Sequence, residues 1–162
     1  MPISGIEQPA VLPIDDGLRL RKFDGSFDFA LEWYQDTETV WLVDGVKAPY
    51  TPEKLERMYR YLDKHGELYW IEVLDGSWKP IGDVAFWRED MPIVIGDKTY
   101  RGQRIGQRVV RALAARGRAL GYSELYVNEI YAYNTGSRTC FEHAGFQAYE
   151  QSEKGSRFVL EL

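Results

Sequence analysis

The sequence has little of several features that mark specialised classes of protein. Its single cysteine, Cys140, allows no disulfide within the chain and no zinc site made of four cysteines. No apolar run approaches the ~20 residues of a membrane span, and the first residues lack the positive start and apolar segment of a signal peptide. We therefore expect a cytoplasmic protein in a reducing compartment, without a metal site and without a membrane partner.

Positive charge is also in short supply. The chain carries 20 Lys and Arg against 25 Asp and Glu, which gives a formal net charge of −5 and a pI near 5.1. This balance argues against non-specific nucleic-acid binding, so we expect no nucleic-acid partner. An acidic chain suits a cationic or amine substrate, although solubility alone explains the balance equally well.

The length and composition indicate one globular domain. A chain of 162 residues with 44% hydrophobic residues can bury a core of its own, and no repeat or change in composition divides it. We therefore expect a single domain over residues 1–162. Residues 1–17 hold three prolines and two glycines without a clear period, which predicts an irregular N-terminal arm.

Residue periodicity predicts a mixed α/β protein. Alternating, β-branched and aromatic runs predict strands, and apolar spacing of three and four predicts helices, the first of them short. The strand after the longest helix is expected to lie parallel to the strand before that helix. The expected strands are 18–23, 67–74, 80–87, 91–95, 124–131, 146–149 and 157–162; the expected helices are 27–34, 51–66, 105–120 and 134–145.

The stretch 93–146 has the pattern of an anion-binding site. A strand is followed by a glycine-containing turn that opens directly into a helix, whose first amides and positive dipole end suit a phosphate. Arg104, Arg108 and Arg111 follow helical spacing along one face of that helix. Cations in a first helical turn are unfavourable by roughly 0.3–1 kcal/mol each, so they are best explained by a bound polyanion.

Two motifs in this stretch resemble a known family. The run from Arg101 to Gly106 resembles the Gln/Arg-x-x-Gly-x-Gly/Ala signature of the GCN5-related N-acetyltransferases (GNAT), which bind the pyrophosphate of acetyl-CoA. A second block, at matching spacing, is similar to that of the branch that acetylates the N-termini of ribosomal proteins. It consists of Glu129, Ile130, Asn134, Ser137, Arg138, Gly145 and Phe146.

The resemblance implies a fold and a co-substrate. The family has a mostly antiparallel mixed sheet whose fourth and fifth strands are parallel and splay apart to admit the pantetheine arm. It implies that backbone amides around Val94 and Ile95 polarise the acetyl carbonyl. Arg104 departs from the pattern, because it stands where the family usually has glycine; a residue with ordinary helical dihedrals is allowed there if its side chain points away. The residues implied to bind acetyl-CoA are Val94, Ile95, Arg101, Gly102, Gln103, Arg104, Ile105, Gly106, Gln107, Asn134, Ser137 and Arg138.

The resemblance implies a general base but no general acid. Glu129 stands where some members have a catalytic glutamate, and strand alternation puts it on one face with Leu125, Val127 and Tyr131. A strand-end glutamate that merely reaches solvent is an equally good interpretation. Many members protonate the leaving thiolate with a tyrosine, for which this chain has Phe141; Tyr131, Tyr133 or water are the alternatives.

The sequence thus predicts an N-acetyltransferase in which an amine attacks acetyl-CoA directly in a ternary complex. The acceptor is either a protein N-terminus or a small cationic amine such as a polyamine or aminoglycoside. A non-catalytic CoA-binding sensor is the main alternative, and a site for another nucleotide is disfavoured because no phosphate-loop lysine accompanies the glycines. The protein is expected to be a monomer or a homodimer.

Overall fold

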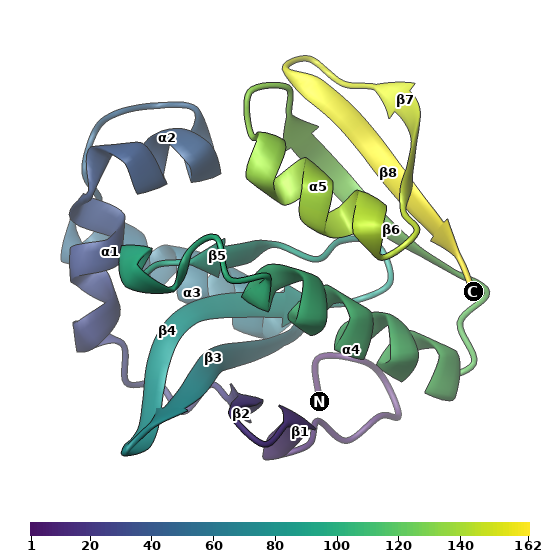
Figure 1. Ribbon diagram of the computed structural model, residues 1–162, viewed down its shortest axis with the longest axis horizontal. Coiled ribbons are helices and arrows are strands. Elements are labelled where there is room, and N and C mark those ends of the chain that lie inside the picture. The colour runs from purple at the N-terminus through teal and green to yellow at the C-terminus, as the bar shows by residue number, and fades with distance from the viewer. The chain divides into compact units, whose positions relative to one another are not determined.

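The structure is a computed structural model that describes all residues from 1 to 162, and its chain divides into two compact units. The first unit consists of Met1–Ala85 and Ile93–Tyr100, and the second of Phe86–Pro92 and Arg101–Leu162. Figure 1 shows the elements of each unit. None of the helices is both long and apolar enough to cross a membrane. Nowhere do three or more His, Cys, Asp or Glu side chains gather as they would around a metal ion.

The first unit contains a five-stranded sheet in the order β1-β2-β3-β4-β5. The pairs β1–β2, β2–β3 and β4–β5 are antiparallel. Three α-helices and two short 3-10 helices, Asp28–Ala30 and Lys98–Tyr100, complete the unit. Its strands are β1 (Val11–Asp15), β2 (Leu18–Lys22), β3 (Glu67–Asp75), β4 (Ser77–Phe86) and β5 (Ile93–Ile95), and its α-helices are α1 (Leu31–Gln35), α2 (Thr37–Asp44) and α3 (Pro52–His65).

Local sequence signals explain where these helices begin. The Asp36 carboxylate accepts the Thr39 amide at 2.9 Å at the start of α2, and the Thr51 hydroxyl accepts the Lys54 amide at 3.2 Å at the start of α3. Pro52 occupies the first turn of α3, where its missing N–H costs nothing. The predicted helix over 51–66 is therefore confirmed to within a residue.

Trp70 lies at the centre of the aromatic core of the first unit. It is fully buried on β3, and its ring centroid lies 4.7 Å from that of Phe29, 5.3 Å from Tyr59, 5.6 Å from Phe23 and 6.1 Å from Trp33. These tilted and edge-on arrangements are the ones that aromatic quadrupoles favour. The contacts hold α1 and α3 on the face of the sheet that carries Trp70.

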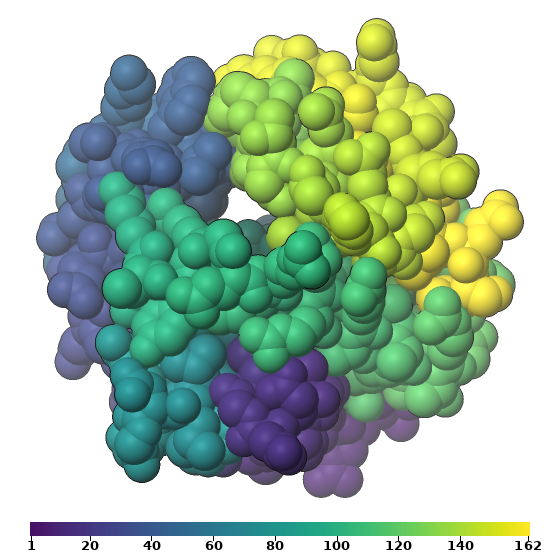
Figure 2. Space-filling model, viewed as in Figure 1, coloured from purple at the N-terminus to yellow at the C-terminus, as the bar shows by residue number.

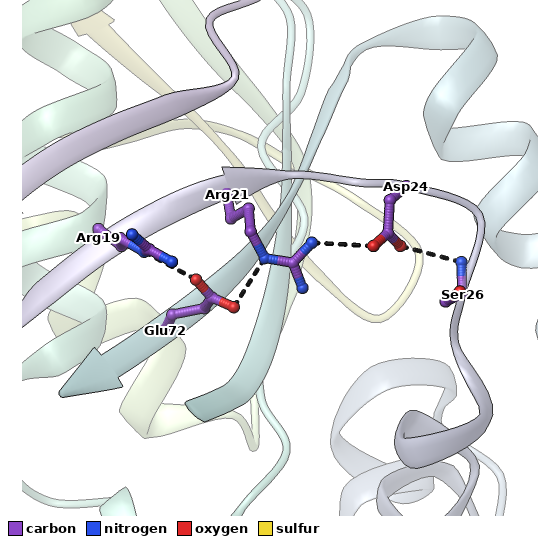
Figure 3. Close-up of polar contacts among 5 residues, drawn as sticks. All are labelled: Arg19, Arg21, Asp24, Ser26 and Glu72. Carbon is purple, nitrogen blue, oxygen red and sulfur yellow. Dashed lines mark hydrogen bonds and ion pairs between the residues drawn. The ribbon is translucent and has the colours of Figure 1, made fainter. Parts of the chain in front are cut away.

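A buried carboxylate on the same face pairs with two arginines of β2 (Figure 3). Glu72 is 3% exposed, and its two oxygens accept separate bonds of 2.8 Å from the Nε atoms of Arg19 and Arg21. Arg21 also pairs with Asp24 at 3.0 Å, and the Arg19 guanidinium lies 4.2 Å from the centre of the Trp78 ring. Because each Glu72 oxygen has a charged donor, its burial leaves no uncompensated charge.

A second buried carboxylate, Asp83 on β4, is held by neutral donors. The Tyr34 hydroxyl of α1 and the Tyr59 hydroxyl of α3 donate to Asp83 Oδ2 at 2.7 and 2.8 Å. Burial raises the pKa of Asp83 to about 6, more than the two hydroxyls lower it, and it also raises the pKa of both tyrosines. Asp83 lies opposite Val94, so this cluster ties both helices to the strand beside β5.

The second unit contains a three-stranded antiparallel sheet in the order β6-β8-β7 and two helices (Figure 1). Its core includes Leu125 and Val127 of β6 and an edge-on pair, Phe141 and Phe146, at 5.2 Å. The outer side of α5 forms part of the yellow-green surface in Figure 2. The elements are α4 (Ile105–Ala119), β6 (Glu124–Tyr131), α5 (Thr135–His143), β7 (Gln147–Gln151) and β8 (Gly155–Glu161).

The expected α/β class with mostly antiparallel pairing is confirmed. The two strands expected to splay apart, β5 and β6, belong to different sheets. The N-terminal arm is irregular only up to residue 10, because Val11–Asp15 pair with β2 as an edge strand. Proline at position 13 is tolerated there since an edge strand needs only half of its amides. The single domain over residues 1–162 stays a prediction.

The raised pKa of Asp83 predicts a specific pH dependence of stability. The folded protein holds a proton on Asp83 more tightly than the unfolded chain does, so stability falls as the pH rises from 3.8 towards about 6. Relative to Asp83→Asn, which keeps an acceptor for the tyrosines, the wild-type free energy of unfolding should fall by about 2 kcal/mol between pH 4.5 and pH 7. Urea denaturation at both pH values measures this. Asp16→Asn, at an exposed site, is the control, and an equal gap at the two pH values would show that Asp83 does not titrate in this range.

Candidate active site

The loop before α4 turns into the helix through two left-handed residues. Gly102 has φ 76°, and Arg104, the N-cap, has φ 61° and ψ 20°. Arg104 therefore does not have the ordinary helical dihedrals considered for this position; its backbone is left-handed, a conformation that favours glycine. An L residue in this region costs of order 1–3 kcal/mol, and such strain is concentrated at ligand-binding sites.

Among the α-helices, α4 alone begins with neither a side-chain cap nor an acidic residue in its first turn. The side chain of its N-cap, Arg104, makes no cap hydrogen bond. The exposed side chain of Arg104 instead adds positive charge to the positive end of the helix dipole. Ile105, Gly106 and Gln107 thus open a helix whose amides and charge both suit an anion.

Gly106 is required by the packing of the two helices of this unit. A Cβ at this position would lie 2.8 Å from the sulfur of Cys140 on α5, which is too close for a stable contact. Cys140 is half-buried, and burial raises the pKa of its thiol. It therefore fills space against α4, and its raised pKa is the opposite of what a nucleophilic thiol needs.

The start of α5 is capped by the asparagine of the second motif. Asn134 Oδ1 accepts the Ser137 amide at 3.1 Å, so Asn134 caps α5. Arg138 is exposed and its Nε lies 3.7 Å from Glu142, one helical turn further on. The contacts that Asn134, Ser137 and Arg138 are expected to make with acetyl-CoA stay predictions.

The end of β5 carries a β-bulge. The amides of Gly96 and Asp97 both donate to the Ile81 carbonyl, at 2.8 and 2.9 Å. Because amide direction alternates along a strand, the Val94 amide faces β4 as the Gly96 amide does, and the Ile95 amide faces away. The role of the Val94 and Ile95 amides towards the acetyl carbonyl stays a prediction.

A second bulge lies in β6 at Asn128 and Glu129. Val127 is opposite Phe158 and Ile130 is opposite Ser156, so β6 carries one residue more than β8 over this interval. The predicted alternation is therefore wrong after Val127: Ile130, not Glu129, joins the buried face. Glu129 is half-buried, and its Oε2 accepts the Lys154 amide at 3.3 Å.

Asp90 makes a contact with β6 that the sequence did not reveal. Its Oδ1 accepts the amide of Met91 at 2.9 Å and that of Asn128, in the bulge, at 3.0 Å. The Arg88 carbonyl accepts the Tyr126 amide at 2.9 Å on the same edge of β6. Burial raises the pKa of Asp90 despite these two bonds. An acid in a turn carries no sequence signal of a contact 38 residues away.

The side chains considered as proton donors divide into two groups. Phe141 is 1% exposed and packs edge-on against Phe146, so it serves the core. Tyr131 and Tyr133 lie at the end of β6 with their rings stacked, 5.4 Å apart and 25° from parallel. Tyr133 is exposed and Tyr131 is half-buried.

Comparison with known proteins establishes the family. The model of the acetyltransferase (GNAT) domain matches residues 18–147, which is most of the chain. The chain therefore belongs to the GNAT acetyltransferases, and by class it is an acetyl-CoA-dependent N-acetyltransferase. No curated protein sequence matches it.

Solved structures share the fold at low sequence identity. A domain from Methanocaldococcus jannaschii has a TM-score of 0.79 at 18% identity, covering 91% of this chain and 100% of that one. AAC(6')-Ib in complex with ribostamycin and coenzyme A has a TM-score of 0.75 at 17% identity, covering 90% and 94%. The Salmonella typhimurium acetyltransferase that modifies the N-terminal serine of ribosomal protein L7/L12 has a TM-score of 0.70 at 17% identity, covering 94% and 99%.

The left-handed conformation of Arg104 predicts a stabilising substitution. Arg104→Gly removes the Cβ from a residue with φ 61° and should raise the free energy of unfolding by about 1 kcal/mol. Arg104→Ala, which loses the charge but keeps the Cβ, is the matched control and should bring no such gain. Chemical denaturation of the three proteins measures the effect. Equal stability of the Gly and Ala variants would show that the backbone is not strained here.

Proposed function

We propose that this acetyltransferase transfers the acetyl group of acetyl-CoA to a primary amine by direct attack in a ternary complex. The observation that supports it best is the start of α4, where a left-handed loop leads into a helix without a side-chain cap and without an acid. A pyrophosphate supplies the acceptor oxygens and the negative charge that this helix start lacks.

The residues present fit acetyl-CoA. The amides of the segment from Gly102 to Gln107 would bind the pyrophosphate, with Arg101 and Arg104 adding charge. Asn134, Ser137 and Arg138, at the start of α5, would hold the pantetheine arm and the phosphates. Backbone amides around Val94 and Ile95 would polarise the acetyl carbonyl.

Bound acetyl-CoA supplies an activated thioester, and the protein has two tasks towards it. The first is to place a hydrogen-bond donor on the carbonyl oxygen, where negative charge develops during attack by the amine. The second concerns the protons of the amine. A cationic amine first loses one proton to solvent, because only the neutral amine has a lone pair for attack; the protein then takes the proton that the nitrogen loses as the C–N bond forms and the C–S bond breaks, with CoA leaving as its thiolate. We assign this proton to the Glu129 carboxylate, directly or through a water.

Two classes of acceptor are supported by relatives of the same fold. AAC(6')-Ib is an aminoglycoside acetyltransferase solved in complex with ribostamycin and with kanamycin, and the Salmonella enzyme modifies a protein N-terminus. Both acceptors are amines, and the net charge of −5 suits the cationic form in which each arrives. We therefore keep a protein N-terminus and a small cationic amine as the two candidate acceptors.

A panel assay separates these candidates. The purified chain is titrated with CoA, and thiol release from acetyl-CoA is followed with a serine-initiated peptide, spermidine and kanamycin. We expect CoA to bind and one amine class to release thiol. Binding without turnover of any amine would favour a CoA sensor, and no binding at millimolar CoA would refute the assignment of the α4 start.

Substitution of the proposed base tests the mechanism. Glu129→Gln keeps the shape of the side chain but cannot accept a proton, so kcat should fall about 100-fold while the Kd for CoA changes less than about twofold. Glu161→Gln, an exposed glutamate on β8, is the control. An unchanged kcat in Glu129→Gln would show that another group or water takes the proton.

A further inference from the structure

We infer that Asp90 is a positioning residue, which holds the bulge of β6. The bulge keeps the Glu129 carboxylate off the buried face of the strand, so that it can act as the base. This inference rests on the proposed role of Glu129 as the base. It is carried by three observations within the second unit, all at or next to the bulge.

The first contact joins Asp90 to the bulge itself. Asp90 Oδ1 accepts the Asn128 amide at 3.0 Å, and the same oxygen accepts the Met91 amide at 2.9 Å. Two residues earlier in β6, the Tyr126 amide is taken by a backbone carbonyl, that of Arg88. On this edge of β6, therefore, a side-chain carboxylate replaces the next carbonyl at the point where the strand becomes irregular.

The second point is what the bulge does to Glu129. In a regular strand Glu129 would share the face of Leu125 and Val127, which are 0% and 4% exposed. The extra residue opposite β8 reverses the alternation, so that Ile130 takes the buried place at 5% exposure and Glu129 stays half-buried. Loss of the bulge would carry the carboxylate towards an apolar core, where its charge is costly.

The third contact holds the carboxylate. Glu129 Oε2 accepts the Lys154 amide at 3.3 Å, and the Lys154 carbonyl accepts the Ala132 amide at 3.0 Å. Lys154 lies in the turn between β7 and β8, so this turn holds the side chain of Glu129. Asp90 holds the backbone of the preceding residue, Asn128. On this inference both hydrogen bonds are needed, since a shift of about 1 Å at a catalytic group can cost about 100-fold in rate.

The experiment compares Asp90→Ala with Asp90→Asn. Asparagine keeps an oxygen that can accept both amides, whereas alanine removes it. In Asp90→Ala we expect hydrogen exchange of the Asn128 and Lys154 amides, followed by NMR, to accelerate about tenfold. We expect kcat for thiol release to fall at least about tenfold with the Kd for CoA unchanged. Asp90→Asn should restore both values to near those of the wild type.

A double variant separates positioning from general stability. If Asp90 acts through Glu129, Asp90→Ala combined with Glu129→Gln should be no slower than Glu129→Gln alone. Glu161→Ala, at an exposed site of the same sheet, is the control for loss of a carboxylate. If Asp90→Ala does not fold, Asp90→Ser, whose hydroxyl is one bond shorter, takes its place.

Each outcome decides the inference. Additive losses in the double variant, or amide exchange unchanged in Asp90→Ala, overturn it. Loss of kcat in Asp90→Asn equal to that in Asp90→Ala also overturns it, because the charge rather than the hydrogen bond would then matter. If no amine in the panel is turned over, the proposed function fails separately, and the exchange of the Asn128 and Lys154 amides alone decides whether Asp90 holds the bulge and the Glu129 carboxylate.

Discussion

The requirement that buried carboxylates be satisfied shapes each unit of this protein. Glu72 meets it with two arginines, so its charge is matched (Figure 3). Asp83 meets it with two neutral tyrosine hydroxyls, which leave the charge uncompensated and the pKa near 6. Asp90 meets it with two backbone amides, one of them in β6. The donors differ, and so does what each acid does: the first joins two strands, the second joins helices to the sheet, and the third sets the shape of a strand.

Periodic patterns predicted the regular parts of the chain and failed where the backbone departs from regularity. The strand over 124–131 was placed correctly because its apolar residues alternate, yet the same alternation misplaced Glu129. A bulge has no composition of its own; it depends on a partner strand and on an acceptor such as Asp90, both distant in sequence. The helix over 51–66 had no such dependence, because its proline and capping threonine act within one turn.

The anion-binding signature was readable from sequence for a related reason, namely that its parts are local. Glycine, a short turn and a helix start lie within a few residues, and only the conformation of Arg104 was misjudged. The family pattern has glycine there, and in this chain the backbone is left-handed although the residue is arginine. The left-handed backbone is thus a property of the loop. Arg104 is strained in this conformation, and its side chain places a positive charge beside the start of α4.

Phe141 affects both the packing of the core and the chemistry. Its ring, on α5, packs edge-on against Phe146, so this position contributes apolar contact and offers no proton to a leaving thiolate. A thiolate whose conjugate acid has a pKa of about 8.5 can leave near neutral pH without such help. On the proposed mechanism, the proton transfer that the protein must then assist is the one from the amine. That transfer depends on Glu129. The bulge in β6 determines which face of the strand carries the Glu129 side chain, and Asp90 accepts an amide of that bulge.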